Sequence, residues 1–383
     1  MESVSFTKSE PAFFFIEKIK RITASNPASW LLLISFFFIV AAAAHSGFFS
    51  KWSLRDASDL SSNNRFSFES MLDGTAHKPF VYRQFVPALA NAADDMLPSN
   101  FKDYIVKRFD PSESYARAIS ANRPSYAFRY RIIYSLHFFA LFSSLFLLRF
   151  IVLNAGGGQM EASFAPAAFL LAFPYLQTVG GYFYDGVELA FLSAAMLAAI
   201  RGKWVILLAL SAIATYNKES FFFYLPTLYP LLRFHFNRYR TISIILSALL
   251  ISGLVNLLLK MAFASNNGGA AEFHLLENLR NYMLPWSYRQ LEVTYGMPGP
   301  HGAFFLTLIL GLLIIIRGWS CIPQRFKTHT ILCLAFNLPL FLLFCATGEL
   351  RNLSFLYVEF VVLLAFAIKM YSSDNEDLSL KPD

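Results

Sequence analysis

A long apolar stretch in the middle of the chain is interrupted by two short polar segments. The first holds Asp185 and Glu188, and the second is Asn217-Lys218-Glu219. Asp185 and Glu188 are three residues apart, so both would point from one face of a helix. Such a carboxylate pair can act as a general base, bind a metal or hold a cation such as Lys218. Lys218 and Glu219 are adjacent and would diverge on a helix, which predicts a different partner for each.

Three basic residues could together form a site for a phosphate group. Arg83 lies in the first long polar segment, Lys218 in the second interruption, and Arg351 in a short polar turn near the C-terminal end. Arginine suits this role because its planar fork of N–H donors binds phosphate oxygens in pairs. The residues expected to orient these cations are Asp185, Glu188, Asn217, Glu219, Glu349 and Asn352.

The same charges also permit a purely structural interpretation. Ionisable groups at hydrocarbon depth cost about 3 kcal/mol each unless they pair or line a polar cavity. Asp185, Lys218, Glu219 and Arg351 directly adjoin apolar runs, which predicts a buried polar cluster. The sequence leaves open whether this cluster is catalytic or a set of ion pairs that hold the helices of a bundle together.

The composition predicts a membrane protein. The 383 residues are 56% hydrophobic and 15% charged, with a mean hydropathy of +0.47, whereas soluble domains are about 25% charged. The net charge of +7 comes from basic clusters between apolar runs. These clusters form no continuous basic face, so nucleic acid is not an expected partner. Basic loops on the cytoplasmic side of a membrane explain them instead.

We therefore predict an all-α, polytopic transmembrane bundle of about ten spans, with cytoplasmic N and C termini. Basic clusters fall on the predicted cytoplasmic side and mixed-charge segments on the outer side. The predicted spans are about 30–49, 131–153, 165–179, 185–200, 204–215, 221–232, 242–263, 303–316, 331–346 and 355–368.

One transmembrane domain, 30–370, accounts for most of the chain. It follows a cytoplasmic segment, 1–29, and precedes a polar tail, 371–383, that we expect to be disordered. Its long outer loops are predicted at about 50–130 and 264–301. Within the first loop, Gln84 to Leu97 alternates apolar and polar residues at helical spacing, which indicates a helix lying at the membrane interface.

This arrangement resembles the superfamily of integral-membrane glycosyltransferases that use polyprenyl-phosphate-linked sugars (the GT-C type). Members place an essential acidic residue in the first outer loop, just after the first span, and carry helices along the membrane in that loop. Asp56 or Asp59 occupies the matching place, and Gln84 to Leu97 would be such a helix. Family members often have adjacent acidic residues there, whereas this chain has an Asp-x-x-Asp spacing.

The resemblance implies transfer of a sugar from a polyprenyl-phosphate donor to an acceptor at the outer face of the bacterial inner membrane. Asp56 or Asp59 would then be the catalytic base, and a divalent metal is a possible cofactor. The expected partners are the lipid-linked donor and membrane lipids.

Two other functions remain open from the sequence. The first is a transporter or flippase of a lipid-linked or small anionic substrate, although no internal repeat of the kind that builds many transporters is evident. The second is a non-catalytic membrane scaffold in which the charges are paired staples.

Overall fold

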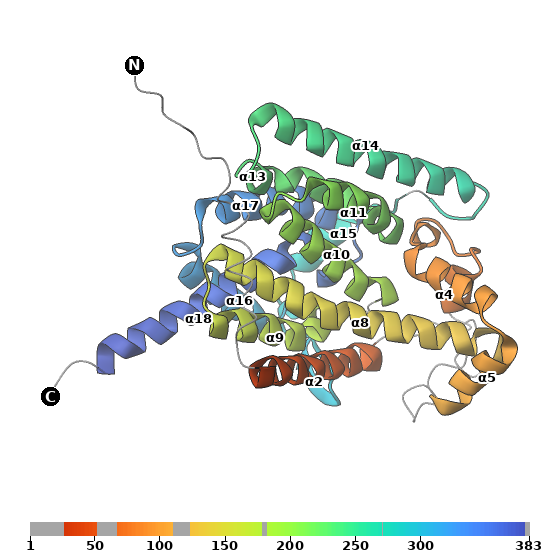
Figure 1. Cartoon of the computed structure of the whole chain (residues 1–383), viewed down its shortest axis with the longest axis horizontal. Helices are drawn as coiled ribbons and strands as arrows, with labels where there is room; N and C mark the ends of the chain where they lie inside the picture. The colour runs from red at the N-terminus through yellow and green to blue at the C-terminus, as the bar shows by residue number, and fades with distance from the viewer. Residues whose placement is uncertain (1–26, 52–66, 110–122, 178–181, 270, 380–383) are drawn as a thin grey trace, which may run out of the picture.

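The computed structural model describes residues 27–51, 67–109, 123–177, 182–269 and 271–379, and these form a helical bundle (Figure 1). Six of the described helices are long and apolar enough to cross a membrane, which indicates a membrane protein. They are α2 (Pro27–Lys51), α8 (Pro124–Ala155), α10 (Phe183–Ile200), α14 (Arg238–Ala262), α17 (Gln324–Phe344) and α18 (Tyr357–Ser379).

The other four predicted spans correspond to helices that are shorter or less apolar. They are α9 (Gln159–Leu176), α11 (Trp204–Asn217), the run α12 (Phe221–Tyr224), η2 (Leu225–Leu228) and α13 (Tyr229–Leu232), and α16 (Phe305–Trp319). The all-α prediction is thus confirmed, while the number of ten crossings remains a prediction. The last helix, α18, continues past Tyr371 into the segment where the sequence predicted a disordered tail.

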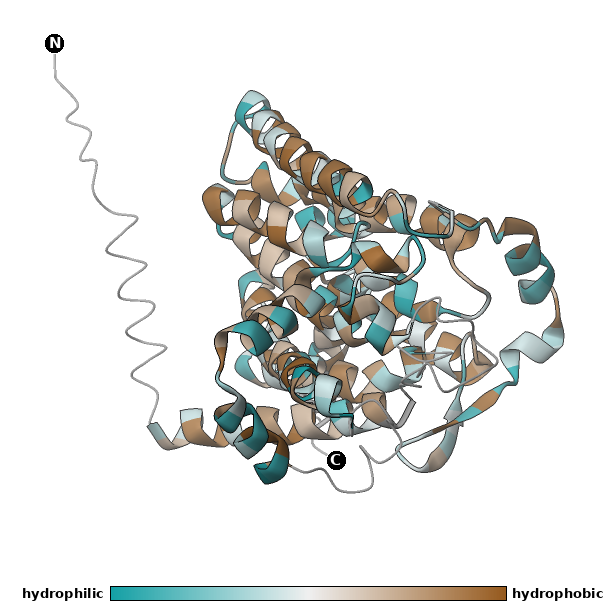
Figure 2. Cartoon of the chain, turned by 90° about the vertical axis from the view of Figure 1, so that its right-hand side faces the viewer, coloured by the Kyte–Doolittle hydropathy of each residue, from teal (hydrophilic) through white to brown (hydrophobic). Residues whose placement is uncertain are grey.

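Helices α8 and α10 pack along each other at the centre of the bundle. Nearly every residue of α10 is buried. The buried face of α8 repeats at helical spacing through His137, Leu141, Leu145 and Leu148. In contrast, α14 lies on the outside and exposes large apolar side chains such as Leu250, which is 75% exposed. Hydrophobic residues run along such outer helices (Figure 2), as expected of surfaces that face lipid.

Contacts between the turns show which of them lie together at each end of the bundle. At one end, Arg325 donates to the carbonyl of Asn154 at 3.0 Å, and Lys369 donates to that of Gly156 at 3.3 Å. At the other end, the first long loop meets two distant turns. Gln84 donates its backbone N–H to Tyr216 O at 3.0 Å, and Lys78 donates its N–H to Asn267 O at 2.8 Å. Within the described residues, Arg325 and Lys369 therefore lie at one end of the bundle and the polar segment from Lys78 to Gln84 lies at the other.

The first long loop contains α3 (Phe68–Leu72), η1 (Phe80–Tyr82), α4 (Phe85–Met96) and α5 (Ser99–Arg108). Helix α4 matches the helix predicted from Gln84 to Leu97, and it buries one face through Val86, Pro87 and Ala90. Helix α8 begins at Pro124, before the predicted start at Arg131. The loop is consequently shorter than predicted, and α8 extends beyond its most apolar part.

The second long loop contains secondary structure that the sequence analysis did not predict. It holds α15 (Leu275–Tyr282), η3 (Pro285–Tyr288) and an antiparallel hairpin of β1 (Leu291–Thr294) and β2 (Met297–Pro300). Tyr295 and Gly296 form the hairpin turn with φ of 57° and 76°, the left-handed geometry of tight hairpins. The Tyr295 hydroxyl donates to Leu171 O at 2.8 Å, and its ring packs on Gly47. The hairpin thereby joins α2 to α9.

Candidate functional site

Four sequence-distant elements bring charged side chains together at the loop end of the bundle. They are the residue after η1, the first two turns of α10, the turn after α11, and the short helix η4 (Leu350–Asn352) with its N-cap. We call the assembled side chains the charged cluster: Arg83, Asp185, Glu188, Lys218, Glu219, Glu349 and Arg351.

Lys218 forms the centre of the charged cluster. Its Nζ lies 2.6 Å from Glu188 Oε2 and 3.8 Å from Asp185 Oδ1, and it donates to Asn352 Oδ1 at 3.3 Å. Asp185 and Glu188 therefore do point from one face of α10 toward the same cation. Glu188 also accepts a 2.8 Å hydrogen bond from the hydroxyl of Ser354. The Lys218, Glu188 and Asp185 side chains are each at most 6% exposed.

Arg351 joins the last outer turn to α10. Its Nη1 donates to Asp185 Oδ2 at 3.1 Å, and its Nη2 donates to Glu349 Oε1 at 3.0 Å. The guanidinium also lies over the ring of Tyr182, 4.6 Å from the centroid, a favourable cation–π geometry. Burial alone would lower the pKa of Arg351, but Glu349 and Asp185 raise it well above its usual range. The residue therefore keeps its charge while buried.

Arg83 pairs with Glu219 rather than with the central carboxylates. Its Nη2 lies 3.3 Å from Glu219 Oε1, and its Nε lies 3.5 Å from Oε2. It also donates to the Tyr184 hydroxyl and lies over the Tyr184 ring, 4.7 Å from the centroid. Lys218 and Glu219 thus have different partners, as the sequence predicted.

Two tyrosines that the sequence analysis did not single out support both arginines. The rings of Tyr182 and Tyr184 stack with centroids 5.2 Å apart and planes 5° apart. Arg351 lies over the first ring and Arg83 over the second. The only sequence signal was their position immediately before Asp185, since nothing in the spacing relates them to either arginine.

The start of α10 fixes the position of the central carboxylates. Asp185 accepts the backbone N–H of Tyr182 at 2.7 Å and so caps the first turn. A carboxylate is favoured at a helix N-terminus because the helix dipole is positive there. Gly186, the next residue, lets α10 approach α8 closely. A Cβ at Gly186 would lie 2.6 Å from His137 Nε2 and 3.1 Å from Leu141 Cδ2.

Replacing Gly186 with alanine is expected to destabilise the protein by about 1–3 kcal/mol, the usual cost of overpacking. His137 cannot easily move away, because its ring stacks on that of Phe48, with the two ring centroids 4.1 Å apart. The thermal midpoint in detergent measures the effect. Gly311→Ala in α16 is the control, since a Cβ there would have no neighbouring heavy atom within 4 Å. Equal midpoints for the two variants would contradict this account of the helix contact.

The charged cluster is buried at its centre and reaches solvent at its rim. The Glu219 and Glu349 side chains are 31% and 15% exposed, compared with 4% for Arg351. Its three cations and four carboxylates give a formal charge of −1. Each cation that the sequence assigned to phosphate binding is thus already paired with a carboxylate.

Two buried polar atoms in this region lack a hydrogen-bond partner within the described part of the chain. They are Arg351 Nε and Asn217 Oδ1. The amide of Asn217 otherwise donates to Tyr184 O at 3.2 Å. Buried polar atoms are nearly always satisfied by protein, water or ligand. These two therefore mark the places where a polar ligand would find unused donor and acceptor capacity.

The remaining site predictions have different outcomes. Asn217, Glu349 and Asn352 all lie at the charged cluster, and Asn352 donates to Glu349 Oε2 at 2.9 Å. Asp56 and Asp59, the predicted catalytic residues, lie outside the described residues. Among the described residues, no group of three His, Cys, Asp or Glu side chains is placed to hold a metal ion.

The Arg83–Glu219 pair makes stability depend on pH. Burial alone would raise the pKa of Glu219, but the charge of Arg83 and its hydrogen bonds lower it below its ordinary value. A carboxylate with a lowered folded-state pKa stabilises the fold above its unfolded-state pKa of about 4.3. This stabilisation is lost as pH falls through the lowered value.

We therefore expect Glu219→Gln to lower the free energy of unfolding at pH 7 by no more than about 1 kcal/mol, because the pair is partly exposed. The thermal midpoint should fall accordingly. The difference from wild type should shrink as the pH falls below about 4. Asp95→Asn, at an exposed carboxylate of α4, is the control and should change little. A difference that is independent of pH would show that charge pairing is not the cause.

No protein-family model, curated protein or solved structure matches this chain.

Proposed function

We propose that this chain is a membrane glycosyltransferase that moves a sugar from a polyprenyl-phosphate donor to an acceptor at the outer membrane face. The observation that carries the proposal is the convergence of Arg83, Lys218 and Arg351 in one cluster beside the first long loop. That loop follows α2 and carries Asp56 and Asp59, the acidic residues that the family resemblance implies for catalysis.

The reaction needs a base and a charge-compensated leaving group. A carboxylate, Asp56 or Asp59, takes the proton of the acceptor hydroxyl as its oxygen bonds to the anomeric carbon. The bond from that carbon to the phosphate oxygen breaks, and the phosphate leaves with the electron pair. Cations near the phosphate stabilise the charge that develops there. The charged cluster supplies such cations.

Arg351 is the best phosphate ligand in the charged cluster. A guanidinium has five N–H donors, and its contacts to Asp185 and Glu349 leave Nε without a partner among the described residues. Of the two carboxylates that hold Arg351, Glu349 is the more exposed, at 15% against 3% for Asp185, so a phosphate entering from the rim approaches the guanidinium on the Glu349 side. Asp185, held by the α10 backbone, keeps the guanidinium oriented.

Native mass spectrometry of the purified protein with added polyprenyl phosphate tests this donor assignment. We expect wild type to retain the lipid and Arg351→Ala to lose it. Arg325→Ala, at the opposite end of the bundle, should behave as wild type. Thermal midpoints establish that each variant is folded, and Arg83→Ala is a second test at a less buried pair. Retention by folded Arg351→Ala and Arg83→Ala alike would refute the phosphate site.

The pairing itself favours a second candidate, a non-catalytic scaffold. Every cation of the charged cluster contacts a carboxylate, as expected of ion-paired staples. A scaffold would tolerate exchange of the charges of Arg83 and Glu219, because Arg83 contacts no other carboxylate of the charged cluster and the pair survives the exchange. A phosphate site would not tolerate it, since the guanidinium would move to the rim.

A further inference from the structure

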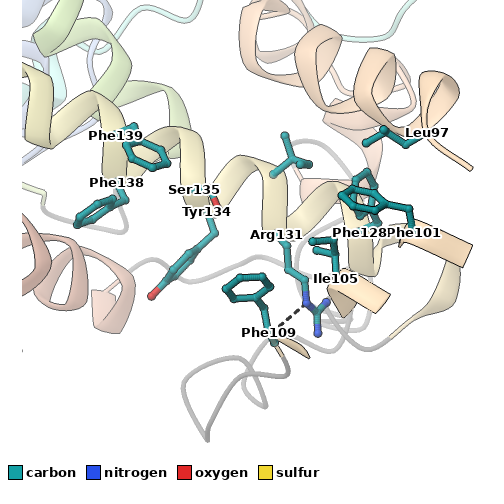
Figure 3. Close-up of a pocket in the computed structure, with 11 residues that line it drawn as sticks. Leu97, Phe101, Ile105, Phe109, Phe128, Arg131, Tyr134, Ser135, Phe138 and Phe139 are labelled. Carbon is teal, nitrogen blue, oxygen red and sulfur yellow. Dashed lines mark hydrogen bonds between the residues drawn. The ribbon is translucent and has the colours of Figure 1, made fainter. Parts of the chain in front are cut away.

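A pocket of about 410 Å³ lies between α5 and α8, and neither the charged cluster nor the proposed reaction uses it. Ligand pockets range from about 300 to 1,000 Å³. On one side, Phe101 and Ile105 of α5 and Phe109, the residue directly after its end, are spaced four residues apart and form an apolar stripe (Figure 3). On the other side α8 contributes Phe128, Ile132, Tyr134, Ser135, Phe138 and Phe139.

The wall formed by α8 links the pocket to the lipid-facing surface. Helix α8 is one of the membrane-length helices, and Phe139, within it, is 60% exposed. At the other side of the pocket, Phe101 and Phe109 are 46% and 62% exposed. An apolar ligand could therefore enter sideways from the bilayer without crossing water. This access favours a lipid chain over a water-soluble ligand.

Positive charge gathers where α5 ends beside the pocket. Arg131 is 5% exposed and lines the pocket, and its guanidinium donates to Val106 O and Phe109 O, each at 3.1 Å. The last turn of α5 carries Lys107 and Arg108, both exposed. An anionic headgroup is favoured next to these cations.

We propose that this pocket binds one acyl chain of an anionic phospholipid, with the headgroup beside Lys107 and Arg108. The ligand comes from the surrounding bilayer, and its phosphate and glycerol stay at the level of the α5 C-terminus. The bound chain completes the apolar contact between α5 and α8. This inference does not depend on the glycosyltransferase proposal, since the pocket shares no residue with the charged cluster.

Native mass spectrometry with defined lipids tests the site. Delipidated protein is mixed with phosphatidylglycerol or phosphatidylcholine of identical chains, and the retained lipid is counted. We expect Ile105→Trp, which fills the pocket, to lower retention of phosphatidylglycerol about tenfold, the effect of excluding roughly two methylene groups. Tyr104→Trp is the matched control, because Tyr104 is the neighbouring residue of α5, is 60% exposed and does not line the pocket.

Preferential retention of phosphatidylglycerol by wild type and Tyr104→Trp, with loss in Ile105→Trp, supports the proposal. Equal retention of both lipids overturns the anionic assignment. Undiminished retention of phosphatidylglycerol by folded Ile105→Trp overturns the location of the site. The location is also overturned if polyprenyl phosphate displaces the bound lipid and excess phosphatidylglycerol does not. Should Ile105→Trp not fold, Phe139→Gln at the exposed mouth of the pocket replaces it, with the same expected loss.

Discussion

Replacing Lys218 with methionine is expected to destabilise the protein by about 3–5 kcal/mol, the usual cost of leaving a buried charge without its partner. Lys218 Nζ is 2.6 Å from Glu188 and 3.8 Å from Asp185, and all three side chains are almost completely buried. Methionine fills similar space but leaves both carboxylates without this cation. Thermal or denaturant unfolding in detergent measures the loss.

A surface pair of the same chemistry provides the control. Lys102 lies 3.0 Å from Asp94, but these side chains are 26% and 29% exposed. Lys102→Met should therefore cost no more than about 1 kcal/mol. Adding Glu188→Gln to Lys218→Met should recover part of the loss, because the stranded charge is then removed. Similar losses for Lys218→Met and Lys102→Met would mean that the central pair contributes no more than a surface contact.

Replacing Asp56 or Asp59 with asparagine is expected to lower sugar transfer by a factor of about 10² to 10⁴, the usual contribution of a general base. Asparagine keeps the size of the side chain but cannot accept the acceptor's proton. Retention of the polyprenyl-phosphate lipid should not change, because these residues are assigned to the acceptor and the cations to the phosphate. Product formation from a lipid-linked sugar measures the effect.

The two carboxylates are tested separately, since the sequence offers both as the base. Asp103→Asn is the control, at an exposed position of α5 in the same loop. Its transfer rate should match wild type. Wild-type transfer rates in both Asp56→Asn and Asp59→Asn would show that neither carboxylate acts as the base, even if the lipid were still bound.

Membership of the charged cluster could be predicted from the sequence, and so could the contact of Lys218 with Asp185 and Glu188 as one possibility, whereas the partners of Arg83 and Arg351 could not. Charges beside apolar runs must find partners, so Asp185, Lys218 and Arg351 were expected in one polar region. The choice of partner depends on distances between elements that are far apart in the chain. Sequence spacing gives only local relations, such as the shared face of Asp185 and Glu188.

The errors in the fold prediction have local causes. Hydropathy marks the most apolar part of a helix, so it placed the start of α8 at Arg131. The signal for the true start is Pro124, which favours the first helical turn. The hairpin was missed because its strands have four residues each and because β2 contains Pro298 and Pro300. Proline normally argues against a strand.

Because the chain is made from its N-terminus, Asp185 and Glu188 of α10 do not gain their basic partners at the same time. Lys218 follows Glu188 by 30 residues, so that carboxylate gains its basic partner as soon as α10 and α11 have been made. Arg351 follows Asp185 by 166 residues. Nascent chains that end before η4 therefore lack the arginine that pairs with Asp185. We expect such truncated chains to depend on the insertion machinery or to be degraded, and full-length chains to be released from it only after the last turn is made.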